Sequence, residues 1–561
     1  MTRPQWSTAC IDWADRLQHG RSIIPPPIYP DQAARALEIF KSLRVVDLPG
    51  RPTFGECCEE WVFDFVAAIF GAYDAETGDQ LIREFYLLIS KKNTKSTIAA
   101  GIMLTALLLC WREEEEHLIL APTKEVADNS FKPAAAMVRA DDDLADLLHV
   151  QDHVRTITHR TSRNSLKVVA ADTETVSGKK SGRVLVDEHW LFGKKANAGA
   201  MFIEALGGQV SRNEGWVIYL TTQADDAPAG VFKDKLTYFR EVRDGRRTDA
   251  RSLGVLYEFP PEMVKSKAYL KPENFHITNP NLGRSVSREW LEDQISKHEG
   301  KIDGTYQQFL AKHLNIEIGL ALMSDRWSGA DHWERNGDPL LTLDALLARS
   351  EVVTLGIDAG GSDDLMALAV LGRERDTGRW LAWCHCWVKR SVLELRKSEA
   401  PRLEGFQADG DLTITEDLTQ QITALAALVE KVRASGLMAE KGIGVDRARI
   451  EAILDELNAV GIGDEQVQAV PQNWTLMGPI IACDRKLTEG NFVHADQPIL
   501  AWAVSNAKVE THKNAFTITK QASGTAKIDP LMAVFDAAAL MARNPEPMNG
   551  APQIIVLELA R

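Results

Sequence analysis

The sequence predicts an α/β fold arranged as two domains. With 561 residues, the chain is too long for one hydrophobic core. From Glu84 onward, short apolar segments alternate with helix-like segments, a pattern typical of a parallel α/β sheet. A second group of apolar strands begins at Glu351, so the pattern occurs twice along the chain.

The first part of the chain is predicted to be a helical lead-in over residues 1–50, interrupted by prolines at 25–27 and 30. We expect the first α/β domain to span residues 51–345, including a connecting region over 257–342 that is rich in Pro, Asn and Trp. Its predicted strands are EFYLLIS, HLILAP, LKVVAAD, RVLVDEHW and WVIYLTT, and its longest apolar helix is IAAGIMLTALLLCW.

The second domain is predicted over residues 346–545. Three strands (EVVTLGID, LMALAVLGRE and WLAWCHCWV) are followed by a helix over 418–434, the strand GIGVD and a last helix over 529–542. Three consecutive strands followed by alternating helices and strands predict a mixed sheet. Residues 546–561, with two prolines and a glycine near their start, are predicted to form a flexible tail.

Composition limits the possible functions. A net charge of −15 argues against a protein that coats nucleic acid, because phosphate contacts need clustered Lys and Arg, although an enzyme with a local basic track remains possible. The longest apolar stretch, residues 98–111, is too short to span a bilayer, and no secretory signal is recognisable, so we expect no membrane partner. Seven cysteines without framework spacing favour a reducing cytoplasm. Strand alternation explains Cys384-His385-Cys386 better than a zinc site does.

A candidate nucleotide site begins with KKNTKST, residues 91–97, between a predicted strand and a long helix. A phosphate-binding loop needs this order, because backbone amides and a helix N-terminus cradle the phosphates. Lys95 would reach the terminal phosphates and Ser96 would hold Mg²⁺. Glycine is usual where Ile89 and Thr94 stand, so a solvated Lys-rich turn is the alternative. The predicted nucleotide-binding residues of the loop are Lys92, Asn93, Thr94, Lys95, Ser96 and Thr97.

Two further strand ends fit the same site. Asp187 and Glu188 follow an apolar strand, where the Asp can hold Mg²⁺ and the Glu can polarise a water molecule. Thr222, within Thr221-Thr222-Gln223, can sense the γ-phosphate. The alternative interpretation of Asp187 and Glu188 is an acid pair at the start of a helix. The alternative for Thr221-Thr222-Gln223 is a polar turn.

A second constellation consists of three aspartates at the ends of predicted elements. Asp358 ends the first strand of the second domain, Asp446 ends GIGVD, and Asp529 begins the last helix. In a ribonuclease-H-like fold these positions converge, and the carboxylates can hold two Mg²⁺ or Mn²⁺ ions for catalysis. The alternatives are a turn before glycines for Asp358 and helix caps for Asp446 and Asp529.

Two other acids are ranked below these three. Asp364 lies one short hairpin beyond Asp358 and is a candidate helper of the metal site. Asp536 lies two turns beyond Asp529, and we expect it to pack or to face away.

From about Leu81 to Ala542 the chain resembles the phage terminase large subunits. The resemblance is carried by KKNTKST, HLILAPTKEVADNSF, SGKKSGRVLVDEHW, TTQ, ITNPNLGRSVSREWLED, FLAKHLNIEI, IDAGGSDDLMALAV and AKIDPLMAVFDAAAL. Thr94 departs from the glycine that this family often has, and threonine resists positive φ. The resemblance implies a P-loop (ASCE-type) ATPase domain followed by a ribonuclease-H-like (RuvC-like) nuclease domain.

The resemblance also implies a function. Hydrolysis of ATP would drive viral double-stranded DNA through a portal protein into procapsids, and the nuclease would cut concatemeric DNA. Lys95 would hold the β- and γ-phosphates, Ser96 and Asp187 the Mg²⁺ ion, and Glu188 would orient the water. Asp358, Asp446 and Asp529 would hold two Mg²⁺ or Mn²⁺ ions. Implied partners are DNA, the portal protein, a small terminase subunit and other copies in a ring, in the host bacterial cytoplasm and transiently docked on the procapsid.

Two competing functions remain open. A repair helicase-nuclease would have a similar nucleotide half, although translocating helicases usually carry a second motor domain. A non-catalytic portal adaptor with a decayed ATPase is favoured by the missing loop glycines and disfavoured by Lys95, Asp187 and Glu188.

Overall fold

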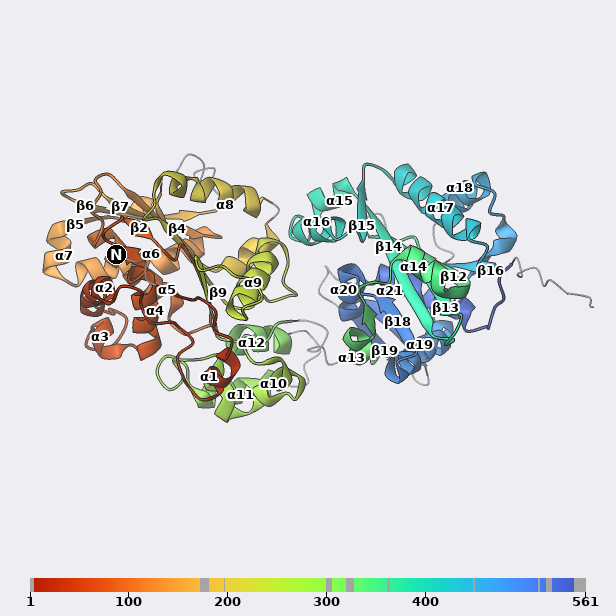
Figure 1. Cartoon of the computed structure of the whole chain (residues 1–561), viewed down its shortest axis with the longest axis horizontal. Helices are drawn as coiled ribbons and strands as arrows, with labels where there is room; N and C mark the ends of the chain where they lie inside the picture. The colour runs from red at the N-terminus through yellow and green to blue at the C-terminus, as the bar shows by residue number, and fades with distance from the viewer. Residues whose placement is uncertain are drawn as a thin grey trace, which may run out of the picture. The chain divides into compact units, whose positions relative to one another are not determined.

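The computed structural model describes residues 5–171, 181–195, 197–298, 305–318, 327–360, 364–446, 450–512, 515–520 and 527–548. The chain divides into two compact units, Met1–Lys301 with Thr305–Ile318 and Ile302–Gly304 with Gly319–Arg561 (Figure 1). Of the predicted tail, residues 549–561 lie outside the described residues.

The first unit begins with helices, the first two of which lie within the predicted lead-in over residues 1–50. They are α1 (Trp13–Gln18), α2 (Pro30–Ser42), α3 (Phe54–Cys57) and α4 (Glu60–Phe70). Phe40 of α2 stacks on Phe54 of α3, with ring centroids 4.5 Å apart. Both rings pack against Gly101, where a Cβ would lie 2.7 Å from Phe40 and 2.9 Å from Phe54. Helices α2 and α3 therefore pack onto the long apolar helix α5 (Lys95–Leu108).

An eight-stranded sheet forms the centre of the first unit, in the order β10-β3-β9-β8-β4-β7-β6-β5. The five pairs from β10 to β7 are parallel, and the pairs β7–β6 and β6–β5 are antiparallel. An extra strand, β9, therefore separates β3 from β8, as expected for the ASCE type. The strands are β3 (Glu84–Leu88), β4 (Glu116–Ala121), β5 (Leu148–Gln151), β6 (Thr156–His159), β7 (Ser165–Ala170), β8 (Arg183–Val186), β9 (Trp216–Thr221) and β10 (Ser252–Leu256); β1 (Tyr73–Asp74) and β2 (Asp79–Gln80) form a separate ribbon.

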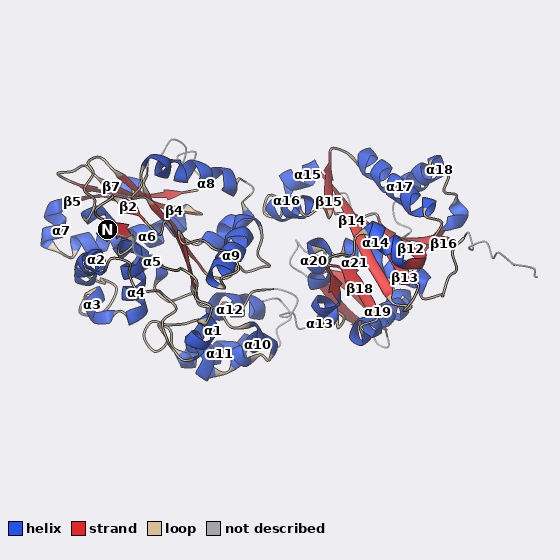
Figure 2. Cartoon of the chain, viewed as in Figure 1, coloured by secondary structure: helices blue, strands red, loops and turns tan. Residues whose placement is uncertain are grey.

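Helices cover both faces of this sheet (Figure 2). On one face, α5 and α6 (Lys124–Arg139) pack on β4 and β7. On the other, α8 (Ala198–Leu206) and α9 (Gly230–Arg243) contribute Phe202, Phe232 and Phe239 to a core with the strands. Both faces are buried, which explains the nearly continuous apolar runs of these strands.

The connecting region packs within the first unit as far as Ile318. Its helices are α10 (Pro261–Lys265), α11 (Arg288–His298) and α12 (Thr305–Leu314), with α7 (Asp142–Leu147) placed earlier in the chain beside β5. The amide of Lys91 donates to the carbonyl of Lys312 at 2.7 Å, so α12 touches the loop after β3.

The second unit is built on a mixed sheet in the order β11-β18-β14-β13-β12-β16-β17, with β15 also paired to β14. The first three long strands form an antiparallel meander, and β16, β17, β15, β18 and β11 join in parallel. The strands are β11 (Gly337–Asp338), β12 (Ser350–Asp358), β13 (Met366–Glu374), β14 (Trp380–Lys389), β15 (Leu412–Thr415), β16 (Met438–Val445), β17 (Val467–Ala469) and β18 (Phe492–Ala495).

Two hydrophobic cores lie on the two faces of this sheet, as the alternation along β13 shows. Ala367, Ala369 and Leu371 belong to one core, and Leu368 and Val370 to the other. The first core is covered by α19 (Met477–Glu489), α20 (Pro498–Asn506) and α21 (Asp529–Met541); the second by α14 (Leu343–Arg349), α17 (Leu418–Ala434) and α18 (Glu451–Ala459). The remaining elements are α13 (Ala330–Trp333), α15 (Arg390–Leu395), α16 (Ala400–Ala408) and the hairpin β19 (Ala507–His512) with β20 (Ala515–Lys520).

Residues 327–345, which are predicted to end the first domain, pack instead in this second unit. Trp327 and Trp333 are buried in its core, and Trp327 meets Phe535 of α21 edge-on at 5.1 Å. Two buried indoles hold this segment on the sheet because large aromatic side chains bury much apolar area. No helix in the described parts of either unit is long and apolar enough to cross a membrane.

Candidate functional site

The loop after β3 carries two non-glycine residues with left-handed backbone. Lys92 has φ +73° and Thr94 has φ +59°. A left-handed threonine costs about 1–2 kcal/mol relative to glycine. Thr94 nevertheless takes the conformation that favours glycine in such loops, so other contacts must offset this cost.

Two asparagines of the connecting region supply those contacts. Asn281 donates its side-chain amide to the Thr94 hydroxyl at 3.2 Å and to the Asn93 carbonyl at 3.3 Å. Asn93 in turn donates to Asn279 Oδ1 at 3.0 Å and accepts from the Asn281 amide at 3.1 Å. Buried amide groups that are hydrogen-bonded on several sides resist rearrangement. The segment ITNPNLG therefore stabilises the conformation of the loop after β3.

Lys95, the first residue of α5, is buried. Its ammonium donates to the carbonyls of Ile89 and Ser90, each at 3.3 Å. Burial lowers the pKa of this amine, and the charges of Glu188 and Asp187 oppose that effect. The Lys95 ammonium is thus bonded to the backbone of the loop in which the phosphates would bind.

Ser96 and Asp187 meet at the same edge of the sheet. Ser96 Oγ donates to Asp187 Oδ2 at 3.3 Å, and Ser130 of α6 donates to the same oxygen at 2.6 Å. Burial, with the neighbouring Glu188 charge, raises the pKa of Asp187 to about 6. An anionic oxygen beside a hydroxyl at a helix N-terminus suits a hard divalent cation.

Glu188 is held in an unusual conformation. Its backbone is left-handed, with φ +48° and ψ +51°. Its carboxylate accepts a 2.5 Å hydrogen bond from the indole N–H of Trp190, and its amide donates to Asp187 Oδ1 at 2.9 Å. A strained backbone that the surroundings keep in place is typical of functional sites.

The end of β9 completes this edge. Register pairs Leu88 with Thr221, so the loop after β3 and the TTQ segment start side by side. Thr221 accepts from the Trp190 amide at 3.1 Å, and the buried Thr222 donates to the Gln223 carbonyl at 3.0 Å. The side-chain amide of Gln223 is buried and has no hydrogen-bond partner among the described residues.

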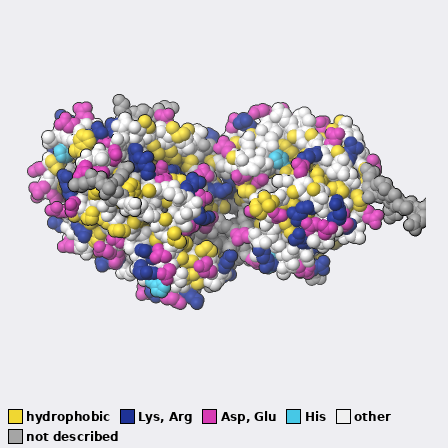
Figure 3. Space-filling model, in the orientation of Figure 1, with side chains coloured by type: hydrophobic (Ala, Val, Ile, Leu, Met, Phe, Trp, Pro, Cys, Tyr) yellow, Lys and Arg dark blue, Asp and Glu magenta, His cyan; other side chains and the backbone are white. Residues whose placement is uncertain are grey.

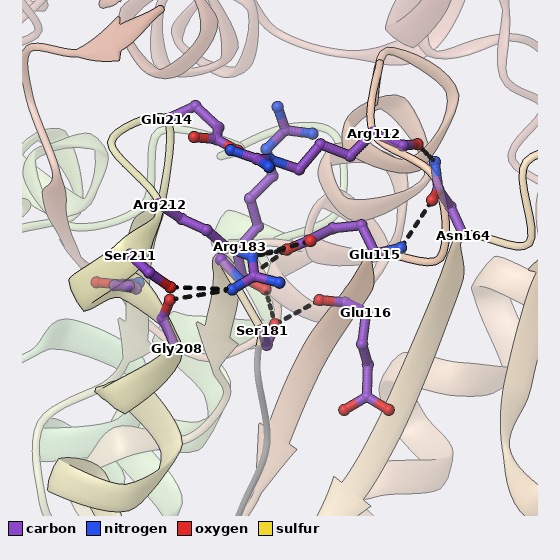
Figure 4. Close-up of polar contacts among 12 residues, drawn as sticks. Arg112, Glu115, Glu116, Asn164, Ser181, Arg183, Gly208, Ser211, Arg212 and Glu214 are labelled. Carbon is purple, nitrogen blue, oxygen red and sulfur yellow. Dashed lines mark hydrogen bonds and ion pairs between the residues drawn. The ribbon is translucent and has the colours of Figure 1, made fainter.

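The opposite edge of the sheet is tied by side chains near the starts of β4, β8 and β9 (Figure 4). Arg212 donates to both carboxylate oxygens of Glu115 at 2.8 and 2.9 Å, and Arg112 pairs with Glu214. Ser181 donates to the Glu116 carbonyl at 2.7 Å. These contacts lie at the amino ends of the strands. The candidate nucleotide-binding residues lie at the opposite edge of the sheet, at the carboxyl ends of the strands.

The loop residues predicted for nucleotide binding are thus placed together with Asp187, Glu188 and Thr222 at one edge. Lys92 is exposed, Thr97 is half-buried, and Asn93 and Lys95 are buried. Sequence reasoning missed Trp190, Asn281 and Lys312. DEHW, ITNPNLG and FLAKHLNIEI contain these three residues, but no local pattern gives a role to residues that act through tertiary contacts.

In the second unit, Asp358 and Asp446 stand at neighbouring strand ends. β12 and β16 are parallel, and Ile357 pairs with Val445, so the two aspartates follow at one edge. Burial is the main cause that raises the pKa of Asp358 to about 6, and the Asp446 charge adds to it.

Asp529 approaches from the other direction, as the first residue of α21. This helix packs unusually closely on β12, where a Cβ on Gly356 would lie 1.9 Å from the Ala533 carbonyl. Burial raises the pKa of Asp529 to about 8, and Asp358 is the next cause. The negative charge of Asp358 therefore contributes to the raised pKa of Asp529.

Asp536 is fully buried and faces the same region. Gln472 donates its amide to Asp536 Oδ2 at 3.2 Å and also hydrogen-bonds Asp358. Burial raises the pKa of Asp536 strongly, with added effects from Asp358 and Asp446. Asp536 is thus packed in the interior, as one of the two expectations had it, and its carboxyl accepts a hydrogen bond from Gln472. Sequence reasoning missed Gln472, which belongs to no motif.

Asp364 forms an ion pair with the buried Lys527. This contact gives one of the acids near Asp358 a counter-charge. The Asp364 charge nevertheless acts on Asp358 and Asp529, so its place beside the candidate site agrees with the sequence expectation.

Within the described residues, no three His, Cys, Asp or Glu side chains come close enough to hold one metal ion. Like-charged carboxylates repel one another, and a cation would have to draw them together. The chemistry of the donor set fits, since oxygen-only ligands suit Mg²⁺ or Mn²⁺.

Cys384, His385 and Cys386 lie on β14, which confirms the strand interpretation. Both cysteines are buried in one core, and His385 Nε2 contacts the Thr413 hydroxyl at 2.8 Å on the other side.

On the face drawn in Figure 3, basic and acidic side chains are interspersed over both units.

Comparison with known families gives two matches. Residues 60–241 match the family description "Terminase large subunit, ATPase domain", and residues 255–545 match "Terminase large subunit, endonuclease domain". A search of curated proteins finds no match.

Solved structures give further similarities. The chain is 18% identical to the HK97 bacteriophage large terminase, covering 91% of this chain and 99% of that one, with a TM-score of 0.45. It is 12% identical to the large terminase of a thermophilic bacteriophage in complex with ADP, covering 82% and 93%, with a TM-score of 0.29. The large terminase nuclease from thermophilic phage G20c is 16% identical, covering 38% and 97%, with a TM-score of 0.25.

Proposed function

Because this chain belongs to the terminase large-subunit family, we propose that it translocates viral double-stranded DNA into procapsids and cuts concatemeric DNA. The chain is a hydrolase with an ATPase domain and an endonuclease domain, and it uses nucleotide and divalent metal. Family membership also implies DNA packaging and contact with DNA and a portal.

In the ATPase domain we assign the phosphates to the loop over residues 92–97. Lys95 contacts the β- and γ-phosphates, Ser96 and Asp187 hold Mg²⁺, and Thr222 senses the γ-phosphate. A bound Mg²⁺ ion neutralises charge on the phosphates. Glu188 orients the attacking water and takes its proton. The support for these roles is their common position at one sheet edge.

In the nuclease domain we assign Asp358, Asp446 and Asp529 as ligands of two Mg²⁺ or Mn²⁺ ions. The ions supply an activated water and stabilise the leaving oxygen. Gln472 keeps Asp358 in place, and the buried Asp536 packs below it. Support comes from the adjacent ends of β12 and β16 and from the mutual electrostatic effects of these carboxyl groups.

The working assembly is proposed to be a ring of chains docked transiently on the procapsid portal in the host bacterial cytoplasm. A small terminase subunit would select the DNA, since contacts to phosphates carry no sequence information. The functional division proposed from sequence is an ATPase domain with its connecting region over 51–345 and a nuclease domain over 346–545, except that residues 327–345 pack with the second unit.

The observation that carries the proposal is the combination of Lys95, Asp187 and Glu188 in one unit with paired strand-end aspartates in the other. A repair helicase-nuclease would share both features but would usually carry a second motor domain, and a portal adaptor needs neither feature.

The test of the nuclease is plasmid cleavage with Mn²⁺ or Mg²⁺. We expect wild type to cut and Asp358→Ala to lose at least about 100-fold in rate, while the exposed Asp376→Ala, in the β13–β14 turn, cuts normally. Equal cutting by Asp358→Ala would refute the metal-site assignment.

The test of packaging is ATP-dependent protection of DNA from nuclease in the presence of portal-bearing procapsids. DNA protection and portal-stimulated ATP turnover support the motor. Turnover without protection would favour the repair enzyme, and binding without turnover the adaptor.

A further inference from the structure

The helix α12 of the connecting region reaches each of the nucleotide elements of the first unit. Its Lys312 accepts at its carbonyl from the Lys91 amide at 2.7 Å, and its Lys312 ammonium donates to the Gln223 carbonyl at 2.8 Å. Just beyond the helix, Asn315 accepts from the Gln223 amide at 3.2 Å. Figure 1 shows α12 below β9, at the edge where these contacts form. One helix is thus joined to both the loop after β3 and the segment after β9.

The Lys312 side chain also reaches the third element, through Trp190. Its Nζ lies 2.9 Å from the centroid of the Trp190 ring, in cation–π contact. The indole N–H of the same ring donates the 2.5 Å hydrogen bond to Glu188 Oε2. The Trp190 amide is fixed separately by Thr221 at 3.1 Å. Lys312, Trp190 and Glu188 therefore form one continuous line of contacts.

Glu188 needs such a restraint. Its left-handed backbone is a conformation that a glutamate leaves readily unless its surroundings oppose the change. A carboxylate that must orient a water molecule loses rate when its position varies by a fraction of an ångström to one ångström. The indole N–H fixes one carboxylate oxygen, and the Lys312 cation fixes the indole.

We propose that Lys312 is a positioning residue for ATP hydrolysis, which holds the Trp190 ring and thereby aims the Glu188 carboxylate. This role rests on the proposed ATPase function of the first unit. Among the residues that the structure describes, the Lys312 side chain forms no hydrogen bond or ion pair with the proposed metal ligands or the phosphate loop, so its removal should affect turnover more than nucleotide binding. Because Lys312 lies in the connecting region, a movement of α12 would change the aim of Glu188 and so couple that region to hydrolysis.

The contacts of the Lys312 amine act against the effect of its burial. Burial lowers the pKa of the Lys312 amine to about 7, Asp225 and Glu188 oppose the shift, and Lys194 and Lys91 add to it. Its contacts with the Trp190 ring and the Gln223 carbonyl favour the cation. Arginine, which stays charged, should therefore replace lysine better than an uncharged side chain of similar length.

The first experiment measures steady-state ATP hydrolysis by the full-length chain at saturating Mg²⁺. We expect Lys312→Met to lower kcat about tenfold or more with KM changed less than about threefold, and Lys312→Arg to recover a large part of the loss. The matched control is Lys297→Met on α11, an exposed lysine paired with Asp293. A Lys312→Met enzyme with normal kcat would overturn the role of Lys312, whereas an inactive wild type would overturn the ATPase function on which it rests.

The second experiment observes the contact without any turnover. In protein labelled with 5-fluorotryptophan, the ¹⁹F resonance of Trp190 is the one lost in Trp190→Phe. We expect Lys312→Met and Glu188→Gln each to shift this resonance, and Lys297→Met to leave it unchanged. If the ¹⁹F chemical shift of Trp190 is unchanged in a folded Lys312→Met protein, the proposal is overturned, even if turnover falls.

Discussion

Ser96 and Asp187 stand 91 positions apart in the chain, yet Ser96 Oγ lies 3.3 Å from Asp187 Oδ2. The hydroxyl belongs to the second residue of helix α5, and the carboxylate follows strand β8. Parallel strands that end at one edge bring the two groups together, and this pairing gives the candidate Mg²⁺ site of the ATPase domain its two protein ligands.

Ser96→Ala should raise the Mg²⁺ concentration needed for half-maximal ATP hydrolysis by about tenfold, the equivalent of about 1.4 kcal/mol. The reason is loss of one oxygen ligand while Asp187 remains. Ser96→Thr keeps the hydroxyl and should stay within about threefold of wild type. A titration of activity against Mg²⁺ at fixed ATP measures this, and an unchanged requirement in Ser96→Ala would rule out Ser96 as a ligand.

Thr94 tests how the loop works without its usual glycine. Thr94→Gly should stay within about 1 kcal/mol of wild type in unfolding free energy and keep ATP turnover, since relief of the left-handed strain offsets the loss of the Asn281 contact. Thr94→Val keeps the strain and loses the hydroxyl, and should destabilise the chain by about 1–2 kcal/mol. Urea unfolding measures the stability of both variants, and an ATPase assay measures their turnover. An inactive Thr94→Gly would show that ATP hydrolysis needs the threonine itself.

Gly356 tests the close packing of α21 on β12. Gly356→Ala places a Cβ 1.9 Å from the Ala533 carbonyl, so the helix that carries Asp529 must move. We expect a loss of about 2–4 kcal/mol in stability and of DNA cutting. Gly405→Ala in α16 meets nothing within 4 Å and should be neutral or slightly stabilising. Equal melting temperatures of the two variants would contradict the packing.

Gln472 tests whether the nuclease aspartates need a neutral donor between them. Gln472→Glu adds a negative charge beside Asp358 and Asp536 and should reduce Mn²⁺-dependent plasmid cutting at least about tenfold at about pH 7. Gln472→Leu removes the amide donor at similar volume and should reduce cutting less. The exposed Gln407→Leu in α16 is the control. Full cutting by Gln472→Glu would exclude a positioning role for Gln472.

Glu374 gives a pH-dependent prediction for stability. Burial alone would raise the pKa of Glu374, but hydrogen bonds and charges from Arg379, Thr377 and Arg349 lower it to about 2. Because the folded pKa lies below the unfolded one, this stabilisation is present above about pH 4.5 and is lost as the pH falls towards about 2. Glu374→Gln should therefore cost about 2 kcal/mol at about pH 7. The difference from wild type, measured by urea unfolding, should shrink from about pH 5 to about pH 3; a constant difference would contradict the ion-pair origin.

The elements of both domains could be predicted from the sequence because their signals are local. The helix over 418–434 and the strand ending at Asp358 appear in the structure with those bounds, since apolar periodicity and burial on both sheet faces set them. The order of strand, lysine loop and long helix likewise predicted where Lys95 and Ser96 would stand.

Tertiary structure alone decided how the sites are held. That Asn281 offsets the missing glycine at Thr94, that Lys312 reaches Trp190, and that Gln472 joins Asp358 to Asp536 depend on segments that meet only after folding. The same holds for residues 327–345, which two buried tryptophans bring to the second unit. Local sequence sets backbone conformation and which face is apolar, whereas polar contacts between distant segments depend on strand order and helix packing, which leave no periodic signal along the chain.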